Sequence, residues 1–260
     1  MLNAENYVII SVLAILSFVL SYFGASIGLV LGQVRLPLLI YALQSANNTI
    51  GIATGTHLAT VAMGALAGTC GHLKGGRVNL RLFCAIGIPS GIGAFLSTLA
   101  FAHVKAEWVK VLIGIVLVYS SFQIANTKKV TQGESRLSPR QRLLLEIAIG
   151  VALGCLSGAV GMALGAIRLP AMVRVLGIDI KDAIGTNLAI NFITASIGAA
   201  TSILTLGVHL PLLLSLVPAT LLGSYLGARS VKKIDASKLR KLLAWTLGGT
   251  GAFMVVESLH

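Results

Sequence analysis

The sequence LGQVRLP at residues 31–37 recurs almost unchanged as LGAIRLP at residues 164–170. Both copies lie inside long apolar stretches, and each brings one arginine, Arg35 or Arg168, into that apolar sequence. An arginine at mid-membrane costs at least about 2.5 kcal/mol to insert, so it is usually kept there by a partner or by a function. The repeat has an offset of 133 residues, about half the chain. It predicts two matching halves, each with one such arginine.

The composition is that of a polytopic membrane protein. Of the 260 residues, 56% are hydrophobic and only 11% are charged, whereas roughly a quarter of the residues of a soluble domain are charged. The mean hydropathy is +0.91, and several apolar runs reach the ~20 residues that span a bilayer. The net charge of +12 comes from basic residues in short connections between apolar segments. This pattern indicates cytoplasmic loops rather than a nucleic-acid surface.

The cysteines and the N-terminus bear further on the class of membrane protein. Cys70, Cys84 and Cys155 form no CxxC pair and no Cys/His cluster, so we expect packing residues rather than a disulfide, a metal site or a cofactor. The N-terminus has Glu5 and no Lys or Arg before its first apolar segment. A cleaved signal peptide begins with basic residues, so we expect this segment to belong to the mature protein.

The expected fold is all-α, with about eight hydrophobic helical segments in two repeats, residues 1–126 and 143–260, joined by a basic connection at 127–142. Residues 7–43 would form a helix of roughly 55 Å, too long for a ~30 Å hydrocarbon core. Glycines followed by Pro37 therefore predict a helix, a break or re-entrant turn, and a short second helix. Residues 143–176 are broken in the same way by glycines and Pro170 and predict the same arrangement. We expect Pro37 and Pro170 to start or restrict the second, short helices.

The remaining segments follow in the same order in both halves. We expect helices at about 49–71, 82–102, 109–126 and 182–205, then one with Pro218 that ends near Arg229, and a last one that ends near Val256. Asn47 to Thr49 and Asp179 with Asp182 are candidate helix N-caps.

A second motif supports the duplication. GTHLA at residues 55–59 matches GTNLA at residues 185–189 with an offset of 130, and Pro89 matches Pro218 with an offset of 129. Internal repeats of this kind are common in secondary transporters.

Loop charge distinguishes parallel from inverted halves. If every apolar segment crosses the membrane once, the Lys and Arg of the loops divide into eight and ten, which shows no bias. If each broken run instead enters and leaves on the same side, one face collects 16 and the other only Lys105 and Lys110. The second split obeys the positive-inside rule. We therefore expect inverted halves, both termini in the periplasm, and a cytoplasmic connection at 126–142.

Inversion gives the paired arginines a shared location. Two breaks that enter from opposite faces can meet near the midplane, where repeat-built transporters bind their substrates, and the N-termini of half-helices favour anions. All eight Asp and Glu lie in loops, at termini or at segment ends, with Glu146 nearest to the membrane interior. We expect Arg35 and Arg168 to bind an oxyanion bidentately. The alternative is that they reach an interface or pair with backbone carbonyls.

Small polar residues at repeat-related positions complete the candidate site. Thr56 and His57 of the first half correspond to Thr186 and Asn187 of the second, and all four could donate hydrogen bonds to substrate oxygens. Gln33 and Asn191 are further candidates of the same kind. The alternative is hydrogen bonding between helices, which is routine in membranes. Four other glycines are expected at close helix contacts: Gly64, Gly68, Gly91 and Gly198.

These motifs together resemble the sulfite exporter TauE/SafE family. The resemblance is carried by GCLSGAVG at residues 154–161, by Leu169-Pro170, and by AIGTNLA at residues 183–189, with a related copy in the first half. It covers nearly the whole chain and implies a multi-pass permease of the bacterial inner membrane for sulfur-containing anions such as sulfite and organosulfonates. Where the family usually has a GGG-like run, both halves here have Gly-x-x-Arg-Leu-Pro, which favours an anionic substrate.

The sequence therefore predicts a secondary transporter, in the direction of export, that binds its anion between the repeats by alternating access. An inside-negative potential drives one negative charge outward by about 2.3 kcal/mol per 100 mV, and His57 is the one titratable candidate for proton coupling. Alternatives are an anion channel or facilitator and a membrane assembly or redox factor; an enzyme is not expected. The expected partners are a small anion and the lipid bilayer, with a homodimer as one admissible assembly.

Overall fold

The computed structural model describes residues 4–29, 32–43, 49–100, 114–115, 118–119, 121–122, 138–160, 164–205, 207–231 and 235–257. Every regular element within these ranges is a helix. In chain order they are α1 (Ala4–Ile27), α2 (Gly32–Ala42), α3 (Thr49–Leu73), α4 (Leu80–Leu82), η1 (Phe83–Gly87), α5 (Ile88–Ala100), α7 (Pro139–Val160), α8 (Gly165–Arg174), α9 (Ile180–Thr205), α10 (Leu210–Ser230) and α11 (Ala236–Glu257). Most of the helix expected at 109–126 and the cap at Asn47 and Asn48 lie outside the described residues.

Both long apolar runs are broken, as the sequence predicted. Gly28 ends α1 with a φ of +76°, a left-handed conformation that glycine adopts without steric cost. The amide of Leu29 then donates to the carbonyl oxygen of Gly24 at 2.8 Å. Pro170 does not start the second helix, which was one of the two roles expected of it. Pro170 lies inside α8, which begins at Gly165, because a proline removes only one bond from a short helix whose start is set by the preceding break.

The helix expected at 82–102 is assembled from three pieces. The single turn of α4 leads into the π-helical turn η1, and α5 follows with Pro89 as its second residue. Proline cannot donate to the preceding turn and its ring crowds the carbonyl four residues earlier. A wider π turn immediately before Pro89 accommodates this defect.

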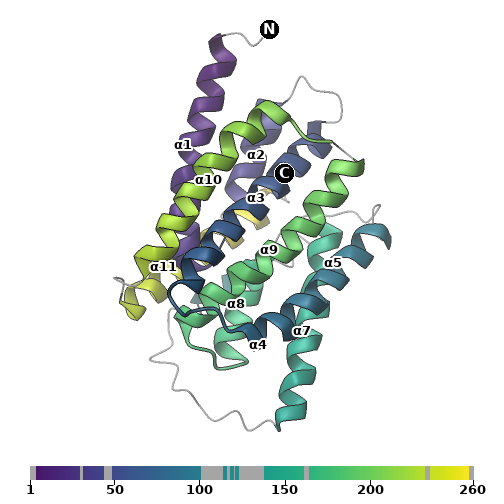
Figure 1. Ribbon diagram of the computed structural model, residues 1–260, viewed down its shortest axis with the longest axis vertical. Coiled ribbons are helices and arrows are strands. Elements are labelled where there is room, and N and C mark those ends of the chain that lie inside the picture. The colour runs from purple at the N-terminus through teal and green to yellow at the C-terminus, as the bar shows by residue number, and fades with distance from the viewer. Residues whose placement is uncertain are drawn as a thin grey trace.

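Glycine contacts establish the directions of the packed helices. Gly223 of α10 lies against the carbonyl oxygen of Phe18, and Gly227 lies against that of Tyr22. The register advances in the same direction on both helices, so α1 and α10 are parallel. Figure 1 shows this pair on one side of α3 and α9, with α5 and α7 on the other side.

The second parallel pair is built in the same way. Gly150, Gly154 and Gly158 of α7 lie against the carbonyl oxygens of Ile86, Ser90 and Ala94 along η1 and α5. In the first pair the glycines belong to α10, whereas here they belong to α7. In both pairs, glycines thus lie against backbone carbonyl oxygens of the partner helix.

The central helices α3 and α9 cross in opposite directions. A Cβ added at Gly198 would lie 3.2 Å from Leu58 Cδ1, and one added at Gly68 would lie 3.1 Å from Leu188 Cδ1. Leu58 and Leu188 are the leucines of the repeated GTxLA motif, and each packs on a glycine of the other half. Gly64 lies against Thr220 and Gly91 against Ile193, so the expectation that these four glycines mark close helix contacts is confirmed.

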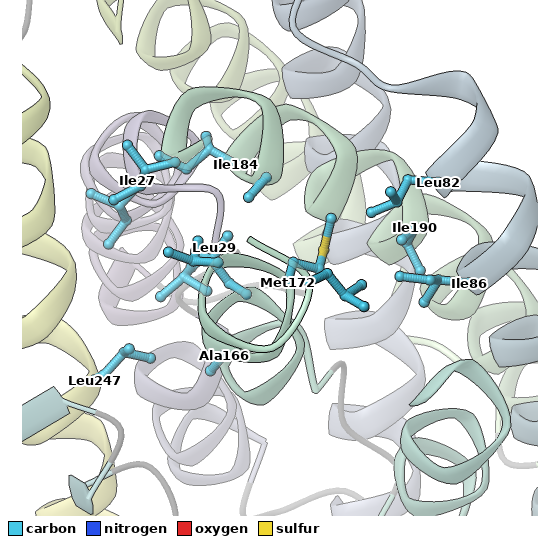
Figure 2. Packing of buried hydrophobic residues seen from close by; sticks show 14 of the residues in the cluster. Ile27, Leu29, Leu82, Ile86, Ala166, Met172, Ile184, Ile190 and Leu247 are labelled. Carbon is cyan, nitrogen blue, oxygen red and sulfur yellow. The ribbon is translucent and has the colours of Figure 1, made fainter. Parts of the chain in front are cut away.

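The main apolar cluster surrounds the two breaks. Figure 2 shows Ile27 and Leu29 from the end of α1, Ala166 and Met172 from α8, and Ile184 from α9. Segments more than a hundred residues apart in sequence are thus held together by buried side chains. Five of the described helical segments are long and apolar enough to cross a membrane: Ile9–Ile27, Leu80–Ser97, Pro139–Gly158, Ile180–Thr205 and Leu210–Ser230.

Candidate functional site

Asn187 joins the two breaks. Its Nδ2 donates to the carbonyl oxygen of Gly28 at 2.8 Å, next to the first break, and to that of Gly165 at 2.9 Å, at the start of α8. Gly28 approaches α9 so closely that a Cβ there would lie 2.7 Å from the Cα of Ile184. One side chain of the second half thus holds backbone from both halves in place.

Arg168 is fully buried beside this junction. Its Nη1 donates to Oδ1 of Asn191 at 3.0 Å and to Oδ1 of Asn187 at 3.4 Å. Its Nε and Nη2 are buried and have no hydrogen-bond partner. A buried charged donor without a partner is costly, so these two nitrogens are the strongest indication of a missing ligand among the described residues.

Arg35 is also buried, at 1% exposure, but it is held differently. Its Nη2 donates to Ser21 Oγ on α1 at 3.1 Å, while Nε and Nη1 are buried without a partner. His57 lies near enough to interact electrostatically with Arg35, and its Nδ1 is likewise buried and unpartnered. Neither arginine reaches an interface, so the alternative that they extend to the membrane surface does not fit their positions.

The acid expected nearest to the membrane interior, Glu146, is paired with other arginines. Glu146 on α7 is fully buried and receives Arg142 Nε at 3.1 Å and Arg81 Nη2 at 3.4 Å. Arg142 also donates to the carbonyl oxygen of Leu176 at 3.5 Å. Within the described residues, no carboxylate forms an ion pair with Arg35 or Arg168.

Thr56 and Thr186 hold the turns of the opposite half. Thr56 Oγ1 accepts from the backbone amide of His209 at 2.9 Å, and Thr186 Oγ1 accepts from that of Asn79 at 2.9 Å. His209 and Asn79 are themselves the N-caps of α10 and α4. The threonines thus bond to turns of the opposite half, which is closer to the alternative of hydrogen bonding between helices than to a contact with substrate.

The glycines of the same motif explain its spacing. Gly55 lies against the carbonyl oxygen of Gly207, and Gly185 lies against that of Arg77. A side chain at either position would displace this turn. The backbone amide two residues further along the same turn donates to the threonine. The Gly-Thr pair of each half thus fixes a turn of the other half. The glycine leaves room for the backbone, and the threonine accepts its hydrogen bond.

The predicted site residues therefore fall into two groups. Arg168 and Asn187 are in contact with each other, and Arg35 and His57 are near each other, whereas Thr56 and Thr186 face the turns. The side chain of Gln33 lies outside the described residues. Asn191, one of the further candidates, bonds directly to Arg168. Ser21 was missed because nothing in its sequence context distinguishes it from other small residues of an apolar helix.

The cysteines differ from the expectation. Cys70 and Cys84 are exposed and Cys155 is partly exposed, and all three are free thiols. Cys70 and Cys84 are therefore not buried packing residues, whereas Cys155 Sγ packs against Gly93 of α5, where an added Cβ would lie 3.3 Å away.

Comparison with known proteins agrees with this architecture. The sulfite exporter TauE/SafE family model matches residues 13–254. The chain is 26% identical to the probable membrane transporter protein MJ0441 of Methanocaldococcus jannaschii over 98% of each chain. It is 25% identical to the probable membrane transporter protein YdhB of Bacillus subtilis, over 95% of this chain and 99% of the relative.

A third relative, a probable membrane transporter protein of Haemophilus influenzae, is 24% identical over 95% of this chain and 94% of its own length. No solved structure shows a significant match. The relatives and the family are membrane transporters rather than enzymes, and the match extends over almost all of the sequence. The chain belongs to the TauE/SafE sulfite exporter family of multi-pass membrane transporters.

Proposed function

We propose that this chain is a secondary transporter that exports small oxyanions, with sulfite and organosulfonates as the substrate class, across a bacterial inner membrane. The observation that carries the proposal is the pair of buried arginines. Arg168 and Arg35 each have two buried nitrogens without a hydrogen-bond partner, and no described carboxylate forms an ion pair with them. A bound anion would supply both the missing charge and the missing acceptors.

The position of Arg168 suits a translocated substrate. It lies where the start of α8 and the end of α1 are joined by Asn187. Irregular backbone at membrane depth is tolerated where it is buried in protein or lines a water-filled path. A substrate bound to Arg168 would thus contact the part of the fold that has to move for the path to open on either side.

Opposite helix directions support an inverted arrangement of the halves. By their motifs, α1 corresponds to α7, α3 to α9, and α5 to α10. In each of these three pairs the two helices run in opposite directions, since α1, α3 and α10 are mutually parallel and antiparallel to α9, which runs with α5. Such halves suit alternating access around a central site. Together with the 16-to-2 distribution of basic residues, this supports a cytoplasmic 126–142 connection and periplasmic termini.

Sulfur oxyanions fit the donor set for two reasons. Guanidinium groups bind the paired oxygens of sulfonate, sulfite or carboxylate in a planar, two-bond geometry. The inside-negative potential also drives a monoanion outward by about 2.3 kcal/mol per 100 mV without a coupling ion. The family to which the chain belongs favours the sulfur anions within this set.

The test is flux in proteoliposomes loaded with sulfite, sulfoacetate, taurine, thiosulfate or acetate, with protein-free liposomes as the control. We expect saturable efflux of at least one sulfur oxyanion that increases when a potassium gradient makes the loaded side negative. A conductance that does not saturate would indicate a channel instead. Equal leakage of every anion from both kinds of vesicle would refute the proposed function.

A further inference from the structure

We propose that one edge of the Arg168 guanidinium recognises the anion, and that Asn191 and Asn187 are the positioning residues that keep this edge open and oriented. This inference rests on the anion transport proposed above and says which anions the site would select. The substrate has to present two oxygens on one atom, as sulfonate, sulfite and carboxylate do, whereas a halide is a single acceptor atom and cannot form two parallel bonds.

A guanidinium has two edges that can bond two oxygens at once. One edge consists of Nε and Nη2, and the other consists of Nη1 and Nη2. Two parallel N–H bonds on one edge match the spacing of two oxygens on a carboxylate or sulfonate. An edge is available when the two N–H hydrogens that point along it are not already used by the protein.

Arg168 has such an edge. Both of its hydrogen bonds leave from Nη1, to Asn191 at 3.0 Å and to Asn187 at 3.4 Å. Nε and Nη2 have no partner although they are buried. The two amides thus hold the guanidinium by its third nitrogen and leave the Nε–Nη2 edge intact.

Arg35 is oriented less firmly. Its single bond to Ser21 uses one hydrogen of Nη2, the nitrogen that both edges share, so one edge is occupied and the other is held by one hydroxyl alone. The helix α3 also offers it no equivalent support, because the positions that correspond to Asn187 and Asn191 are His57 and the apolar Val61. Arg35 therefore has one anchor, whereas two amides fix the orientation of the free edge of Arg168.

The amide partners also explain why Arg168 retains an unbalanced charge. A side-chain amide accepts a hydrogen bond without carrying a negative charge, so Asn191 and Asn187 orient the guanidinium but do not neutralise it. Asn187 has no donor to spare for a substrate, since its Nδ2 already serves Gly28 and Gly165. A carboxylate at position 191 would be a built-in competitor for the anion.

The experiment compares two charge-conserving variants, Arg168→Lys and Arg35→Lys, in purified protein titrated with methanesulfonate and with chloride. Lysine keeps the charge but has no planar edge. We expect Arg168→Lys to lose at least about tenfold in methanesulfonate affinity, the value of one charge-assisted hydrogen bond, with little change for chloride. Arg35→Lys should lose about threefold or less, because a charge remains and no edge that two amides hold in place is removed.

Asn191→Asp provides an independent measurement. It should lower methanesulfonate affinity more than about a hundredfold while keeping the thermal stability of the wild type, since Arg168 then has an internal counter-ion. Equal losses in the two lysine variants, or wild-type affinity in Asn191→Asp, would overturn the inference alone. The methanesulfonate-to-chloride ratio does not depend on the folded fraction of a variant. If the wild type binds none of the oxyanions, the proposed function itself fails.

Discussion

Replacing Asn187 by leucine should destabilise the protein by an amount that the structure allows us to work out. Leucine has the same branched skeleton but no donor, so the carbonyl oxygens of Gly28 and Gly165 both lose their bond to Nδ2, at 2.8 and 2.9 Å. The buried Gly28 carbonyl should cost about 1–3 kcal/mol and the Gly165 carbonyl, which also lies in the helical ladder of α8, about 0.5–1.5 kcal/mol. The total is about 2–4 kcal/mol.

The assay is thermal unfolding of the purified protein in detergent, followed by circular dichroism. For a chain of this size 1 kcal/mol corresponds to about 2–4 °C, so the midpoint should fall by at least about 4 °C. Thr201→Val is the matched control on the same helix, because Thr201 Oγ1 only donates to Ile197 within α9.

Asn187→Asp separates the two roles of this residue. The carboxylate could still accept from Arg168, but it cannot donate to the two carbonyl oxygens and would place a negative charge against them. It should therefore also be less stable than the wild type. A midpoint within 1 °C of the wild type for both Asn187 variants would show that the junction of the two breaks does not depend on these bonds, and the reasoning would be refuted.

Further predictions concern the two Gly-Thr pairs, the ion pairs of Glu146 and the topology. Thr56→Val and Thr186→Val should each cost about 1–3 kcal/mol, because each leaves a turn amide, of His209 or Asn79, without its acceptor; stability differing by several-fold between the two variants would contradict their equivalence. Glu146→Gln should lower the unfolding midpoint more than Arg81→Gln, since Glu146 is buried with two partners whereas the Arg81 side chain is 57% exposed; the reverse order would contradict the burial argument. A cysteine at position 135 should react with an impermeant thiol reagent only from the cytoplasmic side, and labelling only from the periplasm would refute the inverted topology.

The sequence was sufficient for the order of the helices and the positions of the breaks. A glycine-rich run inside an apolar stretch too long for one helix has few other solutions, and the offset of 130–133 residues linked the equivalent elements. The ends of α9 and α10 were predicted to within about two residues for the same reason. Pro170 was misplaced because its ring constrains only its own turn, whereas the start of α8 is set by the preceding glycines.

The candidate site residues could be named from the sequence, but their contacts could not. Arg168 was visible as a charge in an apolar run, but its amide partners belong to α9, and only the packed fold brings α8 and α9 together. The equivalence of Thr56 and Thr186 was also visible, although their role was not. Asn79 and His209 also lie 130 residues apart. This spacing could have identified the two turns that the threonines bind.

The repeats do not predict that Arg35 and Arg168 have different hydrogen-bond partners. The motif predicts equal roles for Arg35 and Arg168, yet Ser21 engages one through the nitrogen shared by both edges and two asparagines engage the other through Nη1. Hydrogen-bond geometry of this kind depends on side-chain positions that no spacing encodes.

The account depends most directly on whether Arg168 binds the anion. Titration calorimetry of sulfite, in the absence of oxygen, should be carried out on the wild type and on Arg168→Gln, with Arg81→Gln as a control at an exposed arginine. We expect saturable binding to the wild type and to Arg81→Gln, and at least a hundredfold weaker binding, about 2.7 kcal/mol, to Arg168→Gln. Equal affinity in the wild type and a folded Arg168→Gln would contradict the account.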